Sequence, residues 1–207
     1  WITSARVSTH DQAERILELL DEREISAVHT AIGSSYGGMV ALALAELAPE
    51  RIRHLVTIGA AHRPHPLATA WRWIQRQITA LGTPGQGLAL ARALAMTSYR
   101  SDRELDARFA QQPEALESWL KHHGALFTER FTEEEFIALS SAIDLHSVTP
   151  EAIETPTTVV GFDSDLLAPP WLLKELVSRL PRATHIELST IYGHDGFLKE
   201  TDAIAPI

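Results

Sequence analysis

Over residues 9–61, the pattern of apolar and polar positions alternates between the period of a helix and that of a strand. Apolar residues recur at helical spacing over 11–20, and a short β-branched apolar run follows at 25–32. A second helix-like stretch occupies 36–47, and a second strand-like run occupies 54–58. Helices and strands that alternate in this way are typical of a parallel sheet covered by helices.

The strand pattern then stops and returns only in the last quarter of the chain, at 157–162 and 185–188. Helix-forming residues dominate the region between, and the chain contains no internal repeat, so this region is predicted to be a helical insertion rather than a solenoid. The expected organisation has three segments: a first part of the core at 1–61, a helical cap at 62–150 and a second part of the core at 151–207.

The pentapeptide Gly33-Ser34-Ser35-Tyr36-Gly37 lies between the first predicted strand and the helix that follows it. Gly-x-Ser-x-Gly in a strand-turn-helix context is the pattern of a nucleophile elbow, where a sharp turn pushes the serine hydroxyl out of the sheet. Small residues on both sides let neighbouring backbone pass close by. The sequence therefore predicts that Ser35 is a catalytic nucleophile.

A serine hydroxyl is a poor nucleophile unless a general base and an orienting acid accompany it. In sheets of this kind the chain order is serine, acid, histidine, and the acid and the base each follow the end of a strand. Asp163 and Asp165 follow the third predicted strand, and His194 follows the fourth. We expect a triad of Ser35, Asp165 and His194, with Asp163 as the alternative acid and a turn-capping role as the alternative for either aspartate.

Further motifs occur in a fixed order along the chain. They are Gly33-Ser34-Ser35-Tyr36-Gly37-Gly38-Met39, Trp71-x-x-x-Gln75-Arg76-Gln77, Leu88-Ala89-Leu90-Ala91-Arg92, Thr97-Ser98-Tyr99-Arg100-Ser101, Ser164-Asp165-x-Leu167-x-Pro169-Pro170 and Gly193-His194-Asp195-x-Phe197-Leu198. Together they resemble the homoserine O-acyltransferases, from about residue 25 to about residue 202. These enzymes have the α/β-hydrolase fold and move an acyl group from acyl-CoA to the homoserine hydroxyl.

The resemblance implies roles for particular residues. The Leu-x-Pro-Pro sequence after Asp165 matches the family and favours this residue over Asp163 as the acid. Arg92 and Tyr99 match residues that line the homoserine site, and Asp195 matches the residue that meets the amino group. Their alternative roles are a solvated helix face for Arg92 and a helix N-cap for Asp195. Acyl-CoA is implied as a co-substrate, and no further cofactor.

The beginning of the chain departs from the family pattern. The chain opens at Trp1, and only about one helix precedes the elbow strand, whereas the family has several strands and an oxyanion loop there. We therefore expect the N-terminal strands of the fold to be missing. The oxyanion is expected to rest on the backbone N–H of Tyr36 and on a second donor from the missing loop.

Composition limits the classes of partner. The 207 residues are 45% hydrophobic and 22% charged, which is enough for a domain-sized core. The formal charge of −9 argues against nucleic acid and anionic membranes as partners, and no apolar run is long enough to span a membrane. The chain has no cysteine, which excludes disulfides and fits the cytoplasm.

Other residues invite a functional interpretation that the pattern does not support. The histidine pairs His62/His65 and His122/His123 fall short of the three or four converging ligands of a zinc site, so no metal is expected. Trp71, Trp73 and their aliphatic neighbours are predicted to pack, because their spacing is helical.

The function expected from the resemblance is ping-pong acyl transfer to L-homoserine in methionine biosynthesis, catalysed by a homodimer joined through cap helices. Succinyl and acetyl donors both occur in the family, with succinyl slightly favoured here, and serine is an alternative acceptor. An esterase or thioesterase of the same fold and a non-catalytic hydrolase-like binding module are the rival functions. The set Arg92, Tyr99 and Asp195 argues against the esterase, because an apolar ester needs no groups that bind an amino acid. An intact triad argues against the binding module.

Overall fold

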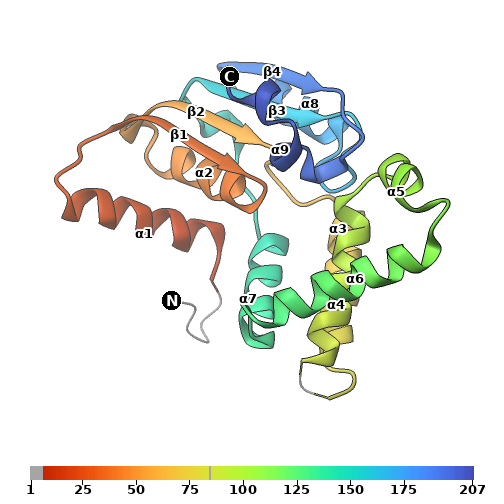
Figure 1. The fold of residues 1–207 in the computed structure, drawn as a ribbon. Coiled ribbons are helices and arrows are strands. Elements are labelled where there is room, and N and C mark those ends of the chain that lie inside the picture. Colours follow the sequence, from red (N-terminus) through yellow and green to blue (C-terminus); the bar gives the residue numbers. More distant parts are fainter. Residues whose placement is uncertain (1–6, 84) are drawn as a thin grey trace.

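The computed structural model describes residues 7–83 and 85–207. Four parallel strands form one sheet in the order β1-β2-β3-β4 (Figure 1). The strands are β1 (Val28–Ser34), β2 (Ile52–Ile58), β3 (Thr157–Phe162) and β4 (Ala183–Leu188). The four predicted strands are therefore confirmed, although β1 begins at Val28 rather than residue 25 and β2 and β4 each begin two residues earlier than predicted.

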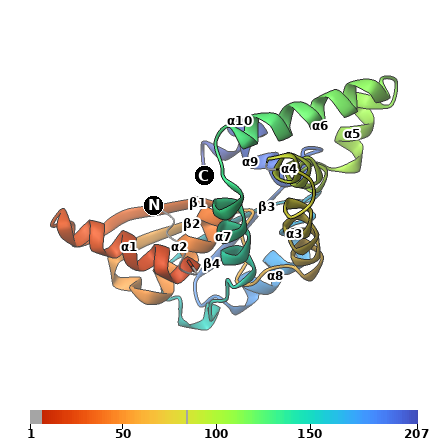
Figure 2. The ribbon, with the colours of Figure 1, turned by 90° about the horizontal axis from the view of Figure 1, so that it is seen from below.

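Helices of the core flank the sheet (Figure 1). In sequence, five consecutive helices are inserted between β2 and β3, and they lie outside the sheet (Figures 1 and 2). The core helices are α1 (Thr9–Glu22), α2 (Tyr36–Leu47), α8 (Pro170–Arg179), α9 (Gly196–Lys199) and α10 (Thr201–Ile204), with 3-10 turns at Pro49–Arg51 (η1), Pro150–Ala152 (η2) and Gly193–Asp195 (η3). The inserted helices are α3 (Pro66–Thr79), α4 (Gln86–Tyr99), α5 (Asp102–Phe109), α6 (Pro113–Thr128) and α7 (Glu133–Asp144). We call these five helices the cap.

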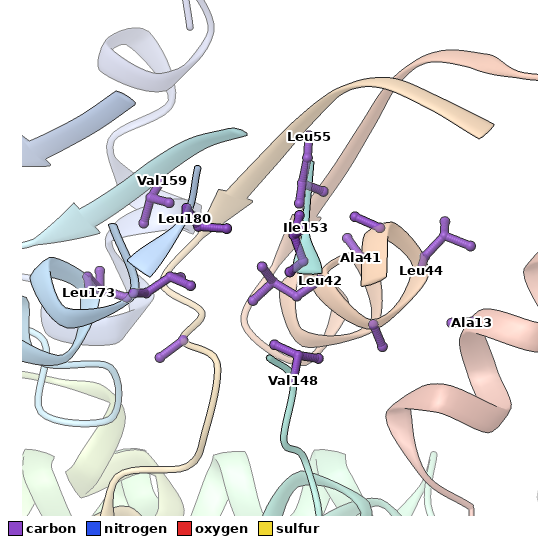
Figure 3. Packing of buried hydrophobic residues seen from close by; sticks show 14 of the residues in the cluster. Ala13, Ala41, Leu42, Leu44, Leu55, Val148, Ile153, Val159, Leu173 and Leu180 are labelled. Atoms are coloured by element: carbon purple, nitrogen blue, oxygen red, sulfur yellow. The ribbon is translucent and has the colours of Figure 1, made fainter. Parts of the chain in front are cut away.

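The hydrophobic core covers both faces of the sheet. On one face, Leu55 and Val159 pack with Leu42 of α2 and Leu173 of α8, and Ala13 of α1 closes the edge of this cluster (Figure 3). Successive side chains of a strand point to opposite faces. A second cluster is therefore built on the other face, where the next residues along β2 and β3 pack against α9 and α10; its members are Val56, Ile58, Val160, Phe162, Ile186, Leu188, Phe197 and Ile204.

Two segments connect the sheet to the cap, and they are hydrogen-bonded to each other. The Val148 N–H donates to the His62 carbonyl at 3.0 Å. Beside this bond, His146 is 1% exposed, and its Nε2–H donates to the Ala61 carbonyl at 3.1 Å while Nδ1 accepts from the Thr9 hydroxyl at 2.8 Å. Burial lowers the pKa of His146 to about 4. The junction between core and cap thus contains a histidine that is held neutral.

Acidification should remove stability that depends on His146. The folded imidazole stays neutral down to about pH 4, whereas an unfolded histidine takes up a proton near pH 6.5. This contribution is fully present above pH 6.5 and is lost as the pH falls toward 4, by about 3 kcal/mol in total. Urea unfolding of the full-length protein between pH 7 and 4.5 should show a steeper loss of stability for the wild type than for His146→Gln.

The exposed His29 provides the control for this measurement. His29→Gln should keep the wild-type dependence of stability on pH. If His146→Gln also keeps it, the buried imidazole does not set the acid sensitivity.

Candidate active site

The turn between β1 and α2 has the backbone of a nucleophile elbow. Ser35 has φ 50° and ψ −119°, a conformation that non-glycine residues rarely adopt. Its N–H donates to the Ile58 carbonyl at 2.8 Å, which ties the turn to the end of β2. The strained turn raises the Ser35 side chain above the carboxyl edge of the sheet.

Glycines make this turn possible by letting backbone pass close to backbone. A Cβ added to Gly33 would lie 2.2 Å from the Gly37 carbonyl oxygen, and a Cβ added to Gly38 would lie 2.5 Å from the Cβ of Ala60. Gly37, in contrast, has no such neighbour within 4 Å among the described residues. The first glycine of the pentapeptide is therefore required by space, and the second is not.

Three side chains from three strand ends form a continuous hydrogen-bonded chain. The Ser35 Oγ lies 2.7 Å from His194 Nε2, and His194 Nδ1 lies 2.7 Å from Asp165 Oδ2. The other oxygen of Asp165 accepts from the backbone N–H groups of Leu167 and Ala168 at 2.8 and 3.0 Å. With Nδ1–H donating to the carboxylate, Nε2 is free to accept the serine proton, which is the arrangement of a catalytic triad.

The environment of His194 favours its charged form. Burial alone would lower the pKa of the imidazole, but the charge and hydrogen bond of Asp165, with a further contribution from Asp195, raise it above the ordinary value. A base that is stabilised when it carries a proton is suited to accept one from Ser35.

The structure also separates the two candidate acids. Asp163 accepts hydrogen bonds from the Ser189 hydroxyl at 2.7 Å and the Thr190 N–H at 3.0 Å. It braces the loop after β4, whereas Asp165 meets the imidazole of His194 directly. The turn-capping role considered for both aspartates is found at Asp165, whose Oδ1 accepts from the next turn of its own loop while Oδ2 meets His194.

A cleft opens above the triad, between the carboxyl edge of the sheet and the cap. Its walls come from the elbow, from the ends of β2 and β3 and from helices α3, α4 and α7; they are Ser35, Tyr36, Met39, Gly59, Pro64, His65, Ala68, Trp71, Arg72, Gln75, Ser98, Tyr99, Ile143, Leu167, Ala168 and His194. The cap therefore covers Ser35. Tyr36 lies next to Ser35 at the start of α2, so its N–H stays the predicted oxyanion donor.

The three residues predicted to bind homoserine are not equally placed. Tyr99 lines the cleft, with its ring centre 6.0 Å from that of His194. Arg92 is absent from the cleft wall, and its guanidinium lies over the rings of Tyr99 and Phe127, at 5.1 and 5.0 Å from their centres. Arg92 thus packs on the Tyr99 ring, but Tyr99 lines the cleft and Arg92 does not.

Asp195 is likewise absent from the cleft wall and has a protein partner. Its Oδ2 lies 2.9 Å from Arg100 Nε, and both side chains are 8% exposed. Burial raises the pKa of Asp195, although Arg100, His194 and Arg92 act in the opposite direction. The predicted N-cap hydrogen bond of Asp195 is not formed at α9.

Three residues near the triad were not singled out from the sequence. Gly59, at φ 59°, follows β2, and a Cβ there would lie 3.4 Å from the His194 ring and 3.5 Å from Asp165 Oδ2. Arg72 lies on the cleft wall, and Arg100 pairs with Asp195. Gly59 had a local signal, because a glycine directly after a predicted strand indicates a turn with positive φ. Arg100 stands in one of the motifs of the resemblance, but the motif does not name its partner.

The tryptophans of α3 differ from the prediction that they pack inside. Trp73 is 57% exposed and Ile74 is 41% exposed, while Trp71 lines the cleft. Helical spacing places apolar residues on one face but does not identify what covers that face.

No group of three or more acidic or histidine side chains within 7–83 and 85–207 could hold a metal ion, and no helix there is long and apolar enough to cross a membrane.

Comparison with known proteins agrees with this fold. The sequence model of the alpha/beta hydrolase fold family matches residues 1–201. The chain is 41% identical to the homoserine O-succinyltransferase of Xanthomonas campestris, over 98% of this chain and 58% of the relative. It is 36% identical to a homoserine O-acetyltransferase of Thermus thermophilus, over 97% of this chain and 57% of the relative.

Among solved structures, the homoserine O-acetyltransferase of Staphylococcus aureus superposes with a TM-score of 0.86 at 27% identity, over 97% of this chain and 63% of that chain. The chain spans less than three fifths of the length of the two curated relatives. It belongs to the alpha/beta hydrolase fold family and, within that fold, to the homoserine O-acyltransferases.

The two glycines of the elbow give a matched pair of variants. Gly33→Ala should destabilise the fold by about 1–3 kcal/mol and abolish labelling of Ser35 by a fluorophosphonate, because the new Cβ overlaps the Gly37 carbonyl. Gly37→Ala should retain both stability and labelling. Urea unfolding and intact-mass spectrometry measure these effects, and equal behaviour of the two variants would contradict the close approach.

The Arg100–Asp195 pair should be a stability determinant beside His194. Arg100→Met leaves Asp195 and the 2% exposed Glu104 without this guanidinium, so a loss of about 3–5 kcal/mol is expected in urea unfolding. The exposed Arg103 is the control, and Arg103→Met should change stability by less than about 0.5 kcal/mol. A loss no larger for Arg100→Met than for the control would show that the pair contributes no stability.

Proposed function

We propose that the protein is an acyl-CoA-dependent homoserine O-acyltransferase that works through an acyl-enzyme at Ser35. The observation that carries this proposal is the hydrogen-bonded chain Ser35–His194–Asp165 beneath a covered cleft, in a chain of this family. The names of the relatives support homoserine as the acceptor, and the geometry of the triad supports an acyl-enzyme.

In the first half-reaction, His194 Nε2 takes the proton of Ser35 as Oγ attacks the thioester carbonyl. The negative charge on the carbonyl oxygen is stabilised by the Tyr36 N–H and a second donor. The C–S bond then breaks, the proton passes from His194 to the leaving sulfur, and CoA departs. The acyl ester of Ser35 remains.

In the second half-reaction, the homoserine hydroxyl enters and gives its proton to His194 as it attacks the acyl ester. The bond between the acyl carbon and Ser35 Oγ breaks, Oγ takes the proton back from His194, and O-acylhomoserine leaves. Water competes with homoserine for the acyl-enzyme, so the cap must position the acceptor and limit water. The position of Tyr99 on the cleft wall supports a role in holding the acceptor.

Arg92 and Asp195 are proposed to assist from behind the cleft wall. The Arg92 guanidinium lies over the Tyr99 ring and acts to lower the pKa of Asp195, so the three side chains lie near one another. Arginine favours the acceptor carboxylate and aspartate favours its ammonium. Asp195 is already paired with Arg100. We infer that, when the acceptor ammonium binds, the Asp195 carboxylate either contacts both cations or exchanges Arg100 for the ammonium.

We further propose that the reaction belongs to methionine biosynthesis in the cytoplasm and that a homodimer joined through the cap carries it out. The exposed Leu67, Ile74 and Leu81, at seven-residue spacing along α3 and just beyond it, are apolar residues that such a contact would cover. A plain esterase or thioesterase remains the rival function, and it differs only in the acceptor.

The function is tested by release of CoA thiol from acetyl-CoA and succinyl-CoA by the full-length protein. L-Homoserine should raise the rate well above hydrolysis alone, because it intercepts the acyl-enzyme. Ser35→Ala should abolish both rates and the acyl adduct in intact-mass spectra, whereas Ser34→Ala, the neighbouring control, should retain the adduct. Thiol release that is independent of homoserine would identify the thioesterase instead.

A further inference from the structure

One wall of the cleft carries a positive charge that the mechanism above does not use. Arg72, on α3, lines the same cleft as Ser35 and His194, and its side chain is 13% exposed. It is close enough to His194 to act electrostatically on the imidazole. A guanidinium in this position can contact a substrate bound at the nucleophile.

The ion pairs around Arg72 do not balance its charge. Arg72 Nε lies 2.7 Å from one oxygen of Asp144, and Arg76 Nη1 lies 2.7 Å from the other. Arg76 and Asp144 are 18% and 14% exposed, so two guanidinium groups share one carboxylate away from bulk water. This cluster keeps one net positive charge. A largely buried charge without a counterpart is costly, so an anion that enters the cleft gains a favourable partner.

Arg72 is also oriented with donors to spare. Nε is held by Asp144, and Nη2 donates to the Thr69 hydroxyl at 3.2 Å. Nη1 has no hydrogen-bond partner among residues 7–83 and 85–207. A guanidinium fixed on one side and free on the other is suited to a planar, bidentate anion, and a carboxylate has that shape.

We propose that Arg72 binds the distal carboxylate of a dicarboxylic acyl group, such as succinyl, while the thioester carbonyl lies at Ser35. This inference rests on the proposed acyl transfer. An acetyl group has no charge to offer Arg72, whereas a succinyl group carries a carboxylate at its far end. The groups assigned to the acceptor, Tyr99, Arg92 and Asp195, lie on α4 and η3, whereas Arg72 lies on α3. Arg72 is therefore a specificity-determining residue for the donor.

Binding to Ser35→Ala separates recognition from turnover. Succinyl-CoA and butyryl-CoA have acyl chains of the same length and differ in the terminal carboxylate. Titration calorimetry on the full-length Ser35→Ala protein should show tighter binding of succinyl-CoA. Adding Arg72→Met should weaken succinyl-CoA binding about ten- to hundredfold and leave butyryl-CoA nearly unchanged. An affinity ratio that Arg72→Met does not change overturns the inference, and so does the absence of binding by either ester.

Arg76→Met is the matched control, because Arg76 pairs with the same carboxylate but is absent from the cleft wall. It should preserve most of the preference for succinyl-CoA. A loss of preference as large as that of Arg72→Met would assign the effect to the cluster as a whole and overturn a direct contact.

Single-turnover kinetics distinguish the two possible sources of the carboxylate. With Ser35 intact, Arg72→Met should slow acylation by succinyl-CoA and spare acylation by butyryl-CoA. If both acylations are spared and only turnover of the acyl-enzyme by homoserine is slowed, Arg72 holds the acceptor carboxylate and the inference is wrong. If the wild type forms no acyl-enzyme with any ester, the proposed function fails, and the binding ratio still decides the role of Arg72.

Discussion

The site depends on the parallel direction of the four strands. Because all of them end at one edge of the sheet, residues 159 and 29 positions apart in sequence meet at hydrogen-bond distance in the Ser35–His194 and His194–Asp165 pairs. The cap leaves the sheet at the carboxyl end of β2, and its return segment is hydrogen-bonded to this exit through Val148 and His62. The cap therefore lies over the same edge and lines the cleft with Ser35 and His194. Strand direction therefore determines both where Ser35, His194 and Asp165 meet and where a cover can be placed over them.

The strands and the triad could be predicted because their signals are local. An apolar run followed by Gly-x-Ser-x-Gly specifies an elbow, and an acid or histidine directly after a strand must lie at its carboxyl end. Among the two aspartates, however, only contacts separate the residue that meets His194 from the one that braces a loop. That distinction depends on the direction in which each side chain points, and the spacing of residues in the sequence does not give this direction.

The cap residues were harder to predict because their roles depend on how helices pack. Arg72, Arg92 and Arg100 all lie on helices or at a helix end and look alike in the sequence. In the structure one lines the cleft, one stacks on rings and one pairs with Asp195. Periodicity finds the face of a helix, but the partner of that face comes from elements far away in sequence.

The insertion of the cap between two paired strands has a consequence for folding. Strand β2 pairs directly with β3, with Leu55 opposite Thr157, although the whole cap separates them in sequence. The cap helices make local contacts that form quickly, whereas the β2–β3 ladder requires closure of a long loop. Early helix formation shortens that loop, because helical segments are more compact than extended chain. A cap that forms its helices first therefore lowers the entropic cost of pairing β2 with β3, compared with an unstructured insertion of the same length.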